Sequence, residues 1–92
     1  MAKDFLSDVD FKDNLVTLTS TDAGSSAAPI LELYRNSASP ADADYIGQIK
    51  FQGRHDGGAK ALYAKITGKI GDASDGSEDG IIEIAHQKAG SN

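Results

Sequence analysis

The chain has 92 residues, enough for one small domain that buries only about 60 to 65% of its unfolded surface. Hydrophobic residues make up 39% of it, with no Trp, three Phe and three Tyr, so a core confined to one chain is expected to be modest. Fourteen acidic against nine basic residues give a net charge of −5, which repels phosphate and argues against nucleic-acid binding.

Two further classes of protein are disfavoured. There is no cysteine, which excludes disulfides, thiolate nucleophiles and cysteine-based zinc sites. No apolar run approaches the roughly 18 residues of a membrane-spanning helix. The N-terminus has an acidic residue, Asp4, where a secretion signal would have its basic stretch. We therefore expect a protein made in the cytoplasm, with no membrane insertion.

Residues 1–14 form a separate N-terminal segment in this interpretation. Phe5, Leu6, Val9 and Phe11 are spaced loosely as on one face of a helix, with acids around them. A short helix and an extended arm laid over a neighbour fit this spacing equally well.

The remainder, residues 15–92, has the period of β-strands. Residues 15–21 (LVTLTST) are rich in β-branched side chains, and residues 30–36 (ILELYRN) place Leu31 and Leu33 on one face. A loop rich in small residues follows each run, with Gly24 and Pro29 in the first loop and Pro40 in the second.

Three further runs alternate more clearly. In residues 45–53, Tyr45, Gly47, Ile49 and Phe51 share a face, and residues 61–72 and 81–86 alternate in the same way. Asp56-Gly57-Gly58 predicts a hairpin turn whose central positions can take positive φ, so the two runs flanking it should pair antiparallel.

These runs predict an all-β domain, a small antiparallel sandwich or meander of about five strands. The apolar residues expected to form its core, shared between copies or within one chain, are Leu31, Leu33, Ile49, Phe51, Leu62, Ile66, Ile82 and Ile84.

Residues 21–90 resemble a β-rich module of tail fibre and other virion structural proteins of tailed bacteriophages, especially marine and cyanophage-like ones. The resemblance rests on the order LELYRNSASPADADYIGQIKFQG, then YAKITGKI, then DASDGSEDG. It implies a homotrimeric, non-enzymatic virion component that connects or attaches a fibre. Its partners would be further copies of itself and other virion proteins, the latter bound through Phe5, Leu6, Val9 and Phe11.

Two constellations suggest chemistry, and each has a simpler explanation. Asp72, Asp75, Glu78 and Asp79 form a calcium candidate, but their spacing is not that of an EF-hand loop, and turns need the same residues. His55 beside Asp56 lies at an expected hairpin tip, where a polar loop end is the favoured interpretation over a proton-transfer pair. No serine has the context of a nucleophile, so we expect neither enzymatic activity nor a cofactor.

Two sets of exposed residues remain open to more than one interpretation. Lys50, Lys60, Lys65 and Lys69 are expected to prevent unwanted strand pairing rather than to form a binding stripe. Tyr34, Tyr45 and Tyr63 suit subunit contacts more than sugar stacking. The alternatives to a fibre module are accordingly a capsid decoration protein and a carbohydrate-binding module that recognises a host-surface glycan.

Overall fold

The computed structural model describes residues 8–90. The chain divides into two compact units, Met1–Leu31 and Glu32–Asn92. The described part of the first unit has no helix or strand. It is organised by short local contacts: Asp10 accepts a hydrogen bond from the backbone of Lys12 and pairs with its ammonium group at 3.3 Å, and Asp22 accepts from the backbone of Gly24.

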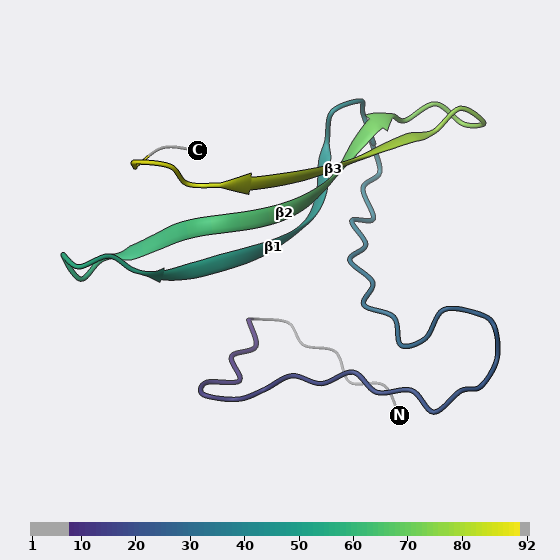
Figure 1. The fold of residues 1–92 in the computed structure, drawn as a ribbon. Helices are drawn as coiled ribbons and strands as arrows, with labels where there is room; N and C mark the ends of the chain where they lie inside the picture. Colours follow the sequence, from purple (N-terminus) through teal and green to yellow (C-terminus); the bar gives the residue numbers. More distant parts are fainter. Residues whose placement is uncertain (1–7, 91–92) are drawn as a thin grey trace. The chain divides into compact units, whose positions relative to one another are not determined.

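The second unit carries one antiparallel sheet of three strands, in the order β1-β2-β3 (Figure 1). The strands are β1 (Tyr45–Arg54), β2 (Lys60–Asp72) and β3 (Asp79–His86). The expected all-β class and the antiparallel pairing across Asp56-Gly57 are therefore confirmed. No helix occurs in residues 8–90, so none there is long and apolar enough to cross a membrane.

The sequence pattern overestimated the number of strands. Residues 15–21 and 30–36 are not strands, and the sheet is open rather than part of a sandwich. Residues 8–14 are not helical either, whereas Phe5 and Leu6 lie outside the described residues. The physical reason is that β-branched composition makes a segment compatible with a sheet, but a strand forms only where a neighbour accepts its backbone hydrogen bonds.

Each hairpin contains a glycine in the left-handed region. At the first turn, Gly58 donates its backbone N–H to His55 at 2.9 Å and has a φ of 96°. This arrangement matches a type I turn followed by a left-handed residue, so of Asp56, Gly57 and Gly58 only Gly58 has a positive φ. In the second turn Ser77 donates to Ser74, and Gly76 has a φ of 88°, as in a type II turn.

The segment before β1 is fastened to the far end of β2. Ala43 donates its backbone N–H to Ile70, and Ile70 donates in turn to Asp44. Asp42 accepts from the backbone of Ala73 at 2.9 Å, and Asp44 accepts from that of Ala41. This acidic turn fixes where β1 begins.

Register shifts interrupt the simple alternation of two strands. Tyr45 pairs with Lys69 and Gly47 with Gly68, so Ile46 is an extra residue in β1. In β2, Leu62 pairs with Gln52 rather than continuing the apolar row of Phe51 and Ala64, because Tyr63 is extra. Such bulges change which residues share a face, which alternation alone cannot predict.

Between these bulges the two faces of the sheet differ in character. Ile49, Ile66 and Ile84 are directly opposite one another on neighbouring strands, so their side chains share one face. We call this the apolar face; it consists of Ile49, Phe51, Ala64, Ile66, Ile82 and Ile84, with His86 at its margin. The polar face contains the residues between them, namely Tyr45, Gln48, Lys50, Lys65, Thr67, Lys69, Ile81, Glu83 and Ala85.

No apolar side chain is buried in the described part of the chain. On the apolar face, Ile49 is 40% exposed, Phe51 53% and Ile84 77%. The one fully buried residue there is Thr67 of the polar face, at 2% exposure. Of the expected core residues, Ile49, Phe51, Ile66, Ile82 and Ile84 share the apolar face, but none of them is buried by the described part of one chain. The expectation was wrong for Leu62, which the bulge removes from the apolar row, and Leu31 and Leu33 lie outside the sheet.

Candidate functional site

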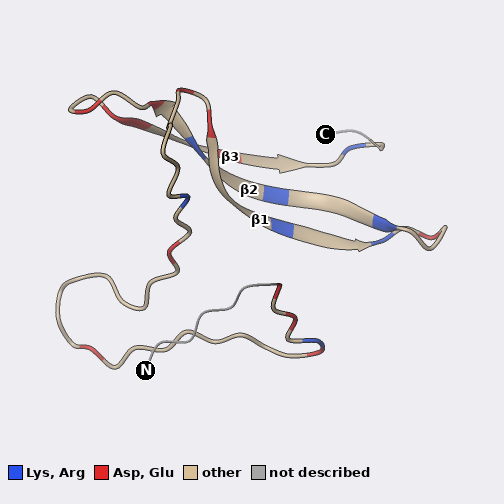
Figure 2. Cartoon of the chain, turned by 180° about the vertical axis from the view of Figure 1, so that it is seen from behind, with Lys and Arg blue, Asp and Glu red and all other residues tan. Residues whose placement is uncertain are grey.

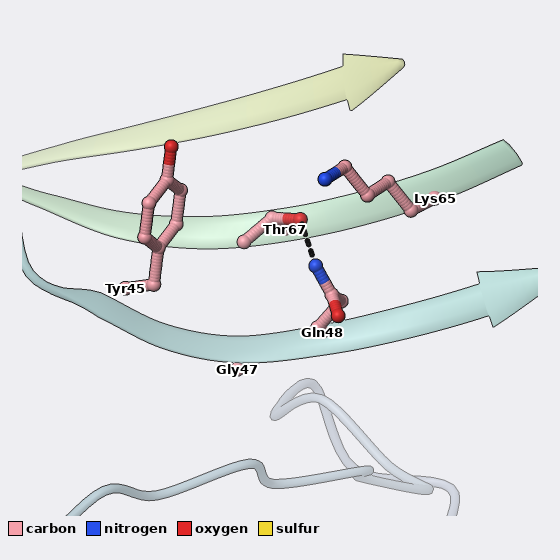
Figure 3. A pocket seen from close by; sticks show the side chains of 5 residues that line it. All are labelled: Tyr45, Gly47, Gln48, Lys65 and Thr67. Atoms are coloured by element: carbon pink, nitrogen blue, oxygen red, sulfur yellow. Dashed lines mark hydrogen bonds between the residues drawn. The ribbon is translucent and has the colours of Figure 1, made fainter. Parts of the chain in front are cut away.

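The polar face carries a shallow hollow of about 390 Å³, lined by Tyr45, Gly47, Gln48, Lys65 and Thr67 (Figure 3). β1 supplies three of these residues, and the central strand β2 supplies the other two. The bulge at Ile46 is what brings Tyr45 here, since it turns Tyr45 away from the face of Ile49 that alternation predicts. The hollow is therefore a product of the strand irregularity.

The floor of the hollow is a hydrogen bond between side chains of neighbouring strands. The Gln48 amide donates to the Thr67 hydroxyl oxygen at 3.1 Å. This bond gives the buried Thr67 hydroxyl group a hydrogen-bond partner. The Gln48 amide oxygen is left as an acceptor. The floor thus offers a fixed polar group at the surface of the sheet.

The two ends of the hollow are chemically different. Tyr45 forms one end, and the Lys69 ammonium nitrogen lies 4.7 Å from the centre of its ring. Lys69 also pairs with Glu83 of β3 at 3.6 Å. The Lys65 side chain extends along β2 toward Thr67 from the other end, as Figure 3 shows.

The charges of the chain are unevenly distributed along the sheet. Figure 2 shows acidic residues at the turn between β2 and β3 and before β1, whereas basic residues lie along β1 and β2. Lys50 and Lys65 are direct cross-strand partners, and neither makes an ion pair with the described residues. A net acidic chain therefore has a locally basic polar face.

The acidic turn between β2 and β3 does not form a metal site in residues 8–90. No group of three or more metal-ligating side chains gathers there, and Asp72, Asp75, Glu78 and Asp79 are not brought together. Asp72 instead accepts a hydrogen bond from the Ser74 backbone at 2.9 Å. That bond, followed by one from the Ser74 side chain, lowers the pKa of Asp72 below its ordinary value.

The side chain of His55 takes part in the first turn rather than in a pair with Asp56. Its Nδ1 accepts the backbone N–H of Gly57 at 2.9 Å, and the Arg54 guanidinium donates to the Gly58 carbonyl. A β-carbon at Gly57 would lie 2.7 Å from the imidazole Cε1. The histidine thus packs closely over the glycine and stabilises the turn.

The three tyrosines lie in separate places. The Tyr34 hydroxyl contacts Asn36, and the Tyr63 hydroxyl donates to the Arg54 carbonyl at 3.4 Å. Tyr63 lines a second hollow, together with His55 and with Gln87, Ala89 and Gly90, while Tyr45 lines the first. A joint tyrosine site is not formed, and the bulge-dependent site at Tyr45 was not foreseeable from alternation.

The remaining candidate residues lie at the surface. Leu33 is half exposed and fills the space beside Gly47, where a β-carbon would be 2.9 Å from that of Leu33. In the first unit, Leu31, Val9 and Phe11 are all exposed. None of these positions forms a cavity with chemical groups around it.

No protein-family model matches the chain, and neither the curated proteins nor the solved structures include a match to it.

Proposed function

We propose that this protein is a non-enzymatic structural module that assembles as a homotrimer through the apolar face of its sheet. The observation that carries this proposal is the combination of an ordered three-stranded sheet with the absence of any buried apolar side chain in residues 8–90. A sheet with one apolar face needs something packed on it to be stable in water. Further copies of the same chain would supply that cover.

The energy available from such packing is large on the scale of a small domain. Full burial of one Ile or Phe side chain contributes about 1.5 to 3 kcal/mol. Ile49, Phe51, Ile82 and Ile84 are each between 40% and 77% exposed, so a large part of this contribution is not realised in one chain. Three sheets that turn their apolar faces toward a common axis would realise it together.

The proposed setting is a tail fibre of a bacteriophage, where the module connects the fibre or attaches it to the virion. Support comes from the resemblance of residues 21–90 to the β-rich module of tail fibre and other virion structural proteins. The open sheet also suits an assembly with a shared core. Phe11 and Val9, which are 58% and 48% exposed, are the described part of the segment proposed to bind another virion protein. Antibody labelling of virions in electron micrographs would separate a tail location from a capsid decoration.

The direct test is the mass of the full-length chain in solution by sedimentation equilibrium at several concentrations. A mass three times that of the chain is expected, with a melting temperature that rises with concentration because unfolding is coupled to dissociation. A monomer that unfolds cooperatively at micromolar concentration, with no dependence on concentration, would contradict the proposal.

A matched pair of variants tests which face is used. Ile84→Glu introduces a charge on the apolar face, and Ala85→Glu introduces the same charge at the next residue, on the polar face, where it is opposite Lys65. Ile84→Glu should shift the mass toward the monomer, whereas Ala85→Glu should leave it unchanged. Equal effects of the two substitutions would show that the apolar face is not the interface.

A further inference from the structure

Two like charges oppose each other on the polar face. Lys50 and Lys65 are direct cross-strand partners, and the residue on the other side of Lys65 is Ala85, which offers no countercharge. Like charges in this position destabilise a sheet. The nearby carboxylate, Glu83, pairs with Lys69. The arrangement leaves a basic site in a chain whose net charge is −5.

The hollow beside this pair combines three kinds of contact. Lys65 brings a positive charge, and the Gln48 amide held by the buried Thr67 brings a fixed polar acceptor. Tyr45 brings an aromatic ring, oriented by Lys69, with an apolar surface and a hydroxyl group. A volume of about 390 Å³ lies at the lower end of the range for small-molecule sites.

We propose that this hollow binds an acidic sugar, that is, a saccharide with a carboxylate group. The carboxylate would lie against Lys65, whose cross-strand partner Lys50 adds positive charge beside the hollow. One hydroxyl would donate to the Gln48 amide oxygen, and the carbon-bound hydrogens of the sugar ring would contact Tyr45. An acidic peptide supplies the carboxylate but lacks the hydroxyl-bearing ring that the other two contacts suit. A neutral sugar leaves the lysine pair without a counterion.

This site does not depend on the proposed assembly. The polar face is opposite the face proposed to meet other copies, so the hollow stays accessible in a trimer. If the mass measurement gave a monomer and the sugar still bound, the assembly proposal would fail and this one would stand.

The test is a titration of the full-length chain, observed in amide NMR spectra, with galacturonate and with uncharged galactose. Galacturonate should shift the signals of Gln48, Lys65 and Thr67 to saturation, and galactose should bind more weakly. Lys65→Gln should weaken galacturonate binding by roughly three- to fivefold, the value of a partly exposed charge pair. Lys60→Gln removes the same charge at the start of β2, outside the hollow, and should leave binding unchanged.

Several results would overturn the inference. They are the absence of saturable shifts with galacturonate, equal binding of galactose, and equal weakening by Lys65→Gln and Lys60→Gln, which would indicate non-specific charge attraction. Tighter binding of a glutamate oligopeptide than of galacturonate would assign the surface to an acidic protein segment instead. If Lys65→Gln altered the spectrum of the free protein throughout, Lys50→Gln on the partner strand would replace it. The galacturonate affinity of Lys50→Gln would then be compared with that of Lys60→Gln.

Discussion

The ammonium group of Lys69 lies over the ring of Tyr45, its nitrogen 4.7 Å from the ring centre, because the extra residue Ile46 turns Tyr45 onto the polar face. The same nitrogen is 3.6 Å from a carboxylate oxygen of Glu83, so Lys69 links all three strands. Lys69→Met, which retains most of the aliphatic stem, should lower the free energy of unfolding by about 1 kcal/mol. Urea unfolding at fixed protein concentration measures this change.

A double-mutant cycle with Tyr45→Leu separates the ring contact from the ion pair. The loss on Lys69→Met should be smaller when Tyr45 is already replaced, because one of the two contacts is then absent. Additive losses would mean that the ring and the ammonium group do not interact energetically.

The glycines of the second hairpin offer a test of backbone conformation alone. A β-carbon at Gly76 or at Gly80 would meet nothing within 4 Å, but only Gly76 has a positive φ, of 88°. Gly76→Ala should therefore destabilise the protein by about 1 to 2 kcal/mol. Gly80→Ala, which introduces the same methyl group without that strain, should be close to neutral. Equal melting temperatures for the two variants would contradict the turn assignment.

Reversal of one charge in the lysine pair should stabilise the sheet. Lys50→Glu places a carboxylate opposite Lys65 and replaces a repulsive cross-strand pair by an attractive one, a gain of about 0.2 to 1 kcal/mol. The gain should shrink at high salt, because exposed charges are screened. Lys50→Gln, which only removes the repulsion, should give a smaller gain. Any loss of stability in Lys50→Glu would show that the register does not bring the two residues together.

The turn between β2 and β3 should contribute to acid sensitivity. Hydrogen bonds from Ser74 lower the pKa of Asp72 in the folded chain, so its stabilising effect is complete above the unfolded pKa of about 3.9. The effect is lost as the pH falls through the folded pKa. The stability of Asp72→Asn should therefore fall less between about pH 6 and about pH 3 than that of the parent protein.

The control for this pH dependence is Asp75→Asn, which removes the same charge from the same turn. If both asparagine variants reduced the loss of stability at acidic pH equally, the effect would come from net charge and not from the Ser74 hydrogen bonds. Chemical unfolding curves at each pH provide the comparison.

The sequence predicted those parts of the fold in which strands are neighbours along the chain. The turn signal at Asp56-Gly57-Gly58 predicted the first hairpin, and alternation placed Ile49, Ile66 and Ile84 among the expected core residues. Residues 15–21 alternate in the same way but form no strand in the described chain. Composition shows that a segment suits a sheet; it does not show that a pairing partner is within reach.

The candidate site was less predictable, because it depends on one inserted residue. Tyr45 and Ile49 share a face by counting, yet the bulge at Ile46 places Tyr45 beside Gln48 and Lys65. Apart from its glycine, the sequence YIGQIK has no feature that distinguishes a bulged strand from a regular one. The glycine at position 47, where Leu33 approaches closely, was the one local sign of an irregularity.

β3 is an edge strand, and its residues from Asp79 to His86 include no lysine and no proline. Edges of this kind readily pair with other chains. During synthesis, therefore, the proposed trimer formation would compete with edge-to-edge pairing, and both would become faster as the concentration of new chains rises. Production at low temperature and modest expression rate should favour the ordered assembly, and a lysine placed on this edge would reduce the competing route.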